Sequence, residues 1–139
     1  MTLKLRNEQP QFTFASTGLE SAYSDDGQAS VRLTAQRASE PGKLHRVELR
    51  FSLVAEFACK TVNFHESFHG ELDIQDAGGR HSGFYRVVDS QRLAAVLDVY
   101  DPRNRFDLKH YIVVGGDGYV EVIAASYVLD AALVETAAS

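Results

Sequence analysis

The most regular pattern in the chain is a nearly strict alternation of apolar and polar residues over positions 47–57. Such alternation is typical of a long β-strand with one buried face and one solvent-facing side. Over residues 61–75 the apolar positions change phase, because every odd-numbered residue there is polar. A phase change of one residue moves side chains to the other face of a sheet, so we predict a bulge or bend near Ala58 and Cys59.

Shorter strands are predicted on both sides of this long run. Residues 31–36 and 84–88 are rich in apolar and β-branched residues and are followed or preceded by turn residues. Residues 110–114 and 119–124 are two further apolar runs, joined by the glycine-rich turn 115–118. Two such runs around a glycine turn are the signature of a β-hairpin.

One helix is predicted between the strand at 84–88 and the hairpin. Leu93, Val96, Leu97 and Tyr100 follow the i, i+3, i+4, i+7 spacing of an apolar helical stripe. Asp89 or Ser90 is placed to cap the start of this helix, and residues 101–102, Asp-Pro, should end it.

Together these elements predict an α+β fold. We expect a mainly antiparallel sheet of about six or seven strands, strongly curved or folded into two layers, with the helix near residues 90–100 over part of one face. Residues 1–139 should form a single domain, with flexible ends at 1–10 and 135–139. The core is expected to come from Val47, Leu49, Phe51, Leu53, Phe57, Val62, Phe64, Leu72, Ile74, Val87, Leu93, Val96, Leu97, Ile112 and Val122.

The composition narrows the cellular setting and the partner. With 45% hydrophobic and 24% charged residues the chain is typical of a globular protein, and its single cysteine, Cys59, is predicted to be a buried thiol. No run of apolar residues is long enough for a signal peptide or a membrane span, which predicts a cytoplasmic protein without membrane association. The net charge of −5 makes nucleic-acid binding unlikely and favours a basic protein surface as partner.

One short motif points to metal chemistry. The sequence His65-Glu66-Ser67-Phe68-His69 matches H-E-x-x-H, and in these residues the chain resembles the zincin metalloproteases. The resemblance implies a zinc-dependent hydrolase in which His65 and His69 are metal ligands and Glu66 is the general base.

The residues around this motif favour a strand, whereas the zincin site requires a helix. On a strand, residues four apart lie about 13 Å from each other, too far for two nitrogens that must each lie about 2 Å from one ion. No third ligand is recognisable, and Gly70 weakens the continuation of a helix. The sequence therefore predicts no metal and no cofactor, and the zinc-dependent hydrolase is kept as an alternative.

Charged residues supply the remaining candidates. Arg103 and Arg105 belong to the only basic cluster with aromatic neighbours, which suits a phosphate or an acidic partner. Asp117 and Glu121 lie in the acidic second half and suit a basic partner. Ser90 follows an aspartate, but helix capping explains it and the nucleophile-elbow pattern G-x-S-x-G is absent.

With no catalytic set in the sequence, the favoured function is a non-enzymatic protein-binding module. In size, acidity and class the chain is comparable with bacterial immunity or inhibitor proteins, which block a toxic or nucleic-acid-handling partner. The candidate partner surface is Asp117, Glu121, Arg103 and Arg105. Two other functions stay open, namely the zinc-dependent hydrolase and the binding of a small molecule inside a curved sheet.

Overall fold

The computed structural model describes residues 3–15, 18–26, 28–62, 64 and 82–134, together with the backbone of residues 72–75. One helix and nine strands lie in this part of the chain. They are β1 (Leu3–Asn7), β2 (Phe12–Phe14), β3 (Glu20–Ser24), β4 (Gln28–Arg37), β5 (Leu44–Lys60), β6 (Leu72–Gln75), β7 (Gly83–Val88), α2 (Gln91–Tyr100), β8 (Lys109–Val114) and β9 (Tyr119–Leu133).

All nine described strands belong to one sheet, in the order β2-β4-β5-β9-β8-β7-β1-β6, with β3 beside β4. Neighbouring strands pair antiparallel, except that β1 and β6 are parallel. The α+β class with a mainly antiparallel sheet is confirmed, and the described strands are more numerous than the six or seven predicted. The hairpin is confirmed as β8 and β9, closed by a hydrogen bond from Gly115 N to Gly118 O.

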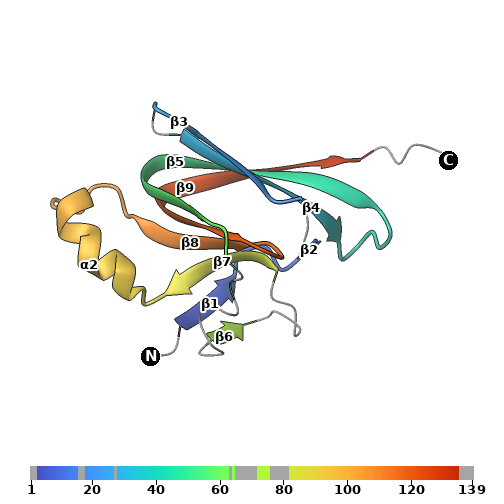
Figure 1. The fold of residues 1–139 in the computed structure, drawn as a ribbon, viewed down its shortest axis with the longest axis horizontal. Coiled ribbons are helices and arrows are strands. Elements are labelled where there is room, and N and C mark those ends of the chain that lie inside the picture. Colours follow the sequence, from blue (N-terminus) through green and yellow to red (C-terminus); the bar gives the residue numbers. More distant parts are fainter. Residues whose placement is uncertain are drawn as a thin grey trace.

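The sheet is strongly curved because its two longest strands bend together. β5 and β9 pair along most of their length, and Figure 1 shows that β3, β4 and part of β5 and β9 lie over β8, β7, β1 and β6. An aromatic cluster fills the space between these layers. Phe51 on β5 lies 5.9 Å from Phe84 on β7, 5.5 Å from Tyr111 on β8 and 6.0 Å from Tyr127 on β9, between ring centroids.

A second buried cluster covers the other face of β7 and β8. It contains Leu5, Phe64, Tyr85, Val87, Ile112, Val114 and Tyr119. Because β7 and β8 bury side chains on both faces, their sequences are almost continuously apolar and do not alternate.

The register shift in β5 lies earlier than predicted. The pairing of β5 with β9 is irregular between Val54 and Glu56, and Leu53 has left-handed backbone with a φ of 53°. Phe51 faces the core and Val54 also packs against it, while Leu53 between them is 59% exposed. The predicted core position of Leu53 is therefore wrong, because the phase changes at this residue and not near Ala58 and Cys59.

The extended pattern over residues 61–75 is only partly realised. β5 ends at Lys60, Thr61 and Val62 are not in a strand, and Val62 is 53% exposed, so its predicted burial is also wrong. Phe64 is buried as predicted but is not in a strand, whereas residues 72–75 form β6. The side chains of Leu72 and Ile74 lie outside the described part of the chain.

The helix α2 has the predicted bounds but not the predicted packing. Ser90 is its N-cap, with Oγ accepting a hydrogen bond from Leu93 N at 3.0 Å, and Asp101 N donates to Leu97 O at its end. No residue of α2 is buried, so the predicted core positions Leu93, Val96 and Leu97 are wrong. The helix lies at one end of the sheet (Figure 1), with its apolar stripe half covered.

The remaining predicted core residues are buried, namely Val47, Leu49, Val87, Ile112 and Val122, and Phe57 is partly buried. The segment 1–10, for which we expected flexibility, contributes β1 between β7 and β6, with Leu5 fully buried. Cys59 is exposed, with Sγ 3.1 Å from Ser21 Oγ, so its predicted burial is wrong. No helix among the described residues is long and apolar enough to cross a membrane.

The packing of the aromatic cluster and of α2 predicts unequal costs for two truncations. Phe51→Ala should lower the free energy of unfolding by about 3–5 kcal/mol, because Phe51 is 1% exposed and touches three other rings. Leu97→Ala should cost only about 1 kcal/mol, below the range of fully buried leucines. Urea unfolding of both variants measures the difference, and equal costs would show that the helix stripe is buried after all.

Candidate functional site

A continuous chain of hydrogen-bonded polar side chains crosses β5, β9 and β8 and ends at the start of α2. Lys60 Nζ lies 2.7 Å from Glu121 Oε2, and Glu121 Oε1 lies 3.1 Å from His110 Nε2. His110 Nδ1 in turn lies 2.7 Å from Ser90 Oγ. We call Lys60, Glu121, His110 and Ser90 the polar chain.

The strand register places three of these side chains on one face of the sheet. In the hairpin, Ile112 pairs with Glu121, which leaves His110 diagonal to Glu121 on the same face. On the other side of β9, Ala58 pairs with Glu121, so Lys60 is diagonal to it as well. Ser90 comes from the turn between β7 and α2, and its contact with His110 completes the row of polar side chains.

Both ring nitrogens of His110 have a partner although the residue is only 4% exposed. When Nε2 carries the proton, it donates to Glu121, and Nδ1 accepts the hydroxyl proton of Ser90. Ser90 Oγ then accepts the N–H of Leu93. This arrangement of protons satisfies every described contact of the polar chain, and in it Nδ1 faces the serine as a proton acceptor.

Glu121 is ionised throughout the ordinary pH range. The hydrogen bond from His110, together with the hydrogen bond and positive charge of Lys60, outweighs burial and lowers the pKa of Glu121 to about 2. The hydrogen bond to Glu121 likewise raises the pKa of Lys60. A fixed carboxylate therefore holds the imidazole of His110 in one orientation.

A second acidic residue on the same face fixes α2 through two contacts. Glu56 accepts hydrogen bonds from Arg92 Nη2 at 2.7 Å and from the Tyr100 hydroxyl at 2.8 Å. Burial opposes the ionisation of Glu56, but the hydrogen bonds from Arg92 and Tyr100 and the charge of Arg92 still lower its pKa. The helix is thus tied to the sheet by polar contacts near both ends.

An open cleft of about 370 Å³ lies along the first turns of α2. Asp89, with a φ of 52°, makes the sharp turn from β7 into the helix and places Ser90 at the edge of the cleft. The apolar wall of the cleft comes from the helix stripe that the sequence assigned to the core. The lining residues are Asp89, Ser90, Gln91, Leu93, Ala94 and Leu97.

The loop that follows α2 is exposed but held in shape by one buried carboxylate. Asp101 is 3% exposed, its Oδ1 accepts the backbone N–H of Arg105 at 2.7 Å, and its Oδ2 accepts that of Phe106 at 2.9 Å. Asn104 and Asp107 have left-handed backbone, with φ values of 50° and 53°. Asparagine and aspartate tolerate this conformation, so the loop is built without unusual strain at these two positions.

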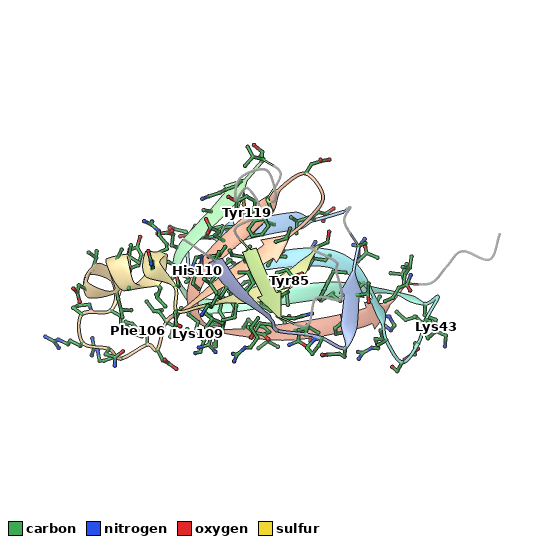
Figure 2. The ribbon with its side chains drawn as sticks, turned by 90° about the horizontal axis from the view of Figure 1, so that it is seen from below. Lys43, Tyr85, Phe106, Lys109, His110 and Tyr119 are labelled. Atoms are coloured by element: carbon green, nitrogen blue, oxygen red, sulfur yellow. The ribbon has the colours of Figure 1, made fainter. Side chains whose placement is uncertain are left out.

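This loop and the irregular stretch of β5 form an apolar depression. The depression has a volume of about 190 Å³. Leu53 and Phe106 at its edge are 59% and 39% exposed, and the guanidinium of Arg105 lies 5.9 Å from the ring of Phe106. Figure 2 shows Phe106 and Lys109 at the end of the molecule that carries α2. We call Leu53, Arg103, Arg105, Phe106 and the depression the loop surface.

The predicted site residues lie in three different settings. Arg103 and Arg105 are exposed on the loop surface, and Asp117 is exposed in the turn of the hairpin. The Glu121 side chain is only 17% exposed and belongs to the polar chain. The H-E-x-x-H residues His65, Glu66 and His69 lie outside the described part of the chain.

Sequence reasoning missed the polar chain as a unit, although the register of the hairpin, which puts His110 and Glu121 on one face, follows from its short turn. Within the described residues no group of three His, Cys, Asp or Glu side chains is placed to hold a metal ion. Comparisons with protein-family models, curated proteins and solved structures find no match to this chain. The polar chain with its cleft and the loop surface are therefore the two features that bear on function.

The ionised state of Glu121 predicts a pH-dependent stability. Its pKa is lowered from 4.5 to about 2 on folding, so the carboxylate stabilises the fold above pH 4.5 and loses this effect as the pH falls toward 2. Glu121→Gln should lower the free energy of unfolding by about 2–3 kcal/mol at neutral pH and by much less near pH 2. Urea unfolding of both proteins at several pH values measures the difference in their free energies of unfolding.

The matched control is Glu40→Gln, which removes a carboxylate from an exposed pair with Lys43. This change should have little effect at any pH, since exposed ion pairs contribute little. If Glu121→Gln lowers the free energy of unfolding by the same amount in acid and at neutral pH, Glu121 is not ionised and paired as described.

Proposed function

We propose that the chain is a protein-binding module that binds an acidic segment of its partner through the loop surface. The observation that carries this proposal is the exposed loop 102–107, held in one shape by buried Asp101. A loop that is already ordered before binding loses less conformational entropy on binding, and binding residues are often found on such loops.

The backbone at Leu53 supports the same surface. A leucine in left-handed conformation costs about 1–3 kcal/mol, and here the strained residue also exposes 59% of its side chain. The left-handed backbone is part of the bend in β5, whereas the exposed side chain contributes nothing to the core. An apolar side chain outside the core is expected where a partner covers it.

The charges of the described residues support an acidic partner. The sequence favoured a basic partner for the acidic second half, but several of its acids are engaged within the fold: Asp101 in the loop, Glu121 in the polar chain and Asp130 with Arg50. By contrast, Arg103 and Arg105 are exposed and have no ion-pair partner in the part of the chain that the structure describes. This distribution favours an acidic partner at the loop surface.

The depression adds a second requirement for the partner. A volume of about 190 Å³ beside Phe106 suits one large apolar side chain, with carboxylates on either side reaching the arginines. Since the whole chain carries a charge of −5, the attraction of acidic groups is local and should be sensitive to salt. A cytoplasmic role of the immunity or inhibitor type fits such binding and is part of the proposal.

The two alternatives from the sequence carry less support. The interior of the curved sheet is filled by the aromatic cluster around Phe51, which favours a partner on the outer surface over a small molecule inside. The zinc-dependent hydrolase rests on His65, Glu66 and His69, outside the described residues, and stays a prediction.

The test is selection of a random-peptide display library on the immobilised protein. Recovered peptides should combine Asp or Glu with an apolar residue. Arg105→Glu and Phe106→Ala should each weaken their binding about tenfold or more, equivalent to about 1.4 kcal/mol. Binding should also weaken as salt is raised.

The control variant is Lys43→Glu, which reverses an exposed charge in the turn at the opposite end of the molecule (Figure 2). It makes the same change in net charge as a single reversal at the loop but should leave peptide binding unchanged. Recovery of basic peptides that bind equally well to Arg105→Glu would reject the loop surface and return attention to Asp117.

A further inference from the structure

We infer that Ser90 is the nucleophile of an acyl-transfer site that hydrolyses carboxylic esters with an apolar acyl group. This activity goes beyond protein binding and uses the start of α2, whereas the loop surface lies at its other end. Four features support it: the polar chain, the first turn of the helix, the cleft and the turn at Asp89.

The polar chain contains a nucleophile, a base and an orienting acid in sequence. Ser90 Oγ lies 2.7 Å from His110 Nδ1, and His110 Nε2 lies 3.1 Å from Glu121. Serine hydrolases use the same order of groups. In them Nε2 of the histidine faces the serine and Nδ1 faces the carboxylate, whereas here Nδ1 faces Ser90 and Nε2 faces Glu121. With Glu121 ionised, the tautomer that donates to Glu121 leaves Nδ1 able to take the proton of Ser90.

The first turn of α2 supplies donors for the negative oxygen that forms during acyl transfer. The backbone N–H groups of Gln91 and Arg92 have no hydrogen-bond partner among the described residues and directly follow Ser90. Donors at a helix N-terminus are aligned with the helix dipole and stabilise an anion there. Asp89, at a φ of 52°, turns the chain sharply between β7 and α2 and so places Ser90 at the junction of strand and helix.

The cleft beside Ser90 determines the class of ester. Its walls include Leu93, Ala94 and Leu97, from the helix stripe that the fold leaves half covered. An apolar acyl chain would cover this stripe and bring its carbonyl carbon next to Ser90. Burial of the acyl chain against Leu93, Ala94 and Leu97 would supply the binding free energy of the ester.

Helix capping alone does not explain the whole arrangement. An N-cap needs only the contact between Ser90 Oγ and Leu93 N, which is present. The cap has no need of a buried histidine and an ionised glutamate behind the serine, and removing such groups from water is costly. Helix capping therefore does not account for His110 and Glu121, whereas activation of the Ser90 hydroxyl does.

The reaction balances with water as the only co-reactant. Ser90 Oγ attacks the ester carbonyl carbon while its proton passes to His110 Nδ1. The ester C–O bond then breaks, and the leaving alkoxide takes that proton to become the alcohol. Water attacks the acyl-serine in the same way, giving its proton to His110, and cleavage of the acyl bond returns the proton to Ser90 with release of the carboxylic acid.

The experiment combines a p-nitrophenyl butyrate assay with fluorophosphonate labelling followed by intact mass and peptide mapping. The wild-type chain should take up one label, at Ser90, and hydrolyse the ester. Ser90→Asn should abolish labelling at this position and lower the rate about a hundredfold or more. Asparagine is as good an N-cap as serine, so this variant should keep the helix and the fold, which circular dichroism verifies.

Two further variants separate chemistry from structure. Ser126→Ala removes an exposed hydroxyl on β9 and should leave both labelling and hydrolysis unchanged. His110→Gln should slow the labelling of Ser90 even where its melting curve shows a folded protein. No label on the wild-type chain, a label on another residue, or equal ester hydrolysis by wild type and Ser90→Asn would each overturn the inference, whatever the outcome of the peptide selection.

Discussion

The bent pairing of β5 with β9 is the constraint on which the rest of the molecule depends. The two strands pair from His45 with Leu133 to Lys60 with Tyr119, and the register shift between Val54 and Glu56 divides this pairing. On one side of the shift β5 also pairs with β4, and on the other side β9 pairs with β8. One pair of strands therefore belongs to both layers, and the aromatic cluster fills the space between them.

The geometry of both candidate surfaces follows from this bend. The shift turns Leu53 out of the core and places it at the depression that Phe106 also lines. The stretch of β5 beyond the shift carries Glu56 and Lys60, which contact α2 and Glu121. A regular β5 would have placed Leu53 on the buried face of Phe51, because alternate residues of a strand share one face.

The helix is attached to the sheet in a way that its sequence did not indicate. An amphipathic helix normally buries its apolar stripe, and the spacing of Leu93 and Leu97 predicted this. In the structure, Ser90 contacts His110 while Arg92 and Tyr100 contact Glu56, and these polar contacts set the distance of the helix from the sheet. The stripe is consequently only half covered, and the cleft results from that.

Local patterns sufficed for most elements but not for the position of the bend. Alternation identified the long strand, glycines identified the hairpin, and apolar spacing with the Ser90 cap identified α2. The bend was misplaced because Leu53 and Val54 are both apolar, and alternation cannot decide which of two adjacent apolar residues faces inward. β1 was missed because a five-residue strand with only two apolar side chains gives too weak a pattern.

For the candidate sites too, local sequence patterns predict contacts between neighbouring strands but not contacts between distant elements. The hairpin register was enough to put His110 beside Glu121, because both lie on neighbouring strands with a known turn. The contact of Ser90 with His110 depends on β7 pairing with β8, and the contacts of Arg92 and Tyr100 with Glu56 depend on the bend. Sheet order and bend are properties of the whole fold, so these contacts had no local signal.

The two surfaces share one rigid element, which gives their arrangement a physical meaning. Ser90 at the start of α2 belongs to the polar chain, and Tyr100 at its end both lines the depression and donates to Glu56. Glu56 accepts from Arg92, two residues after Ser90, and from Tyr100 at once. A side chain in the depression would therefore contact the same helix that carries Ser90 at its start, and no residue of that helix is buried.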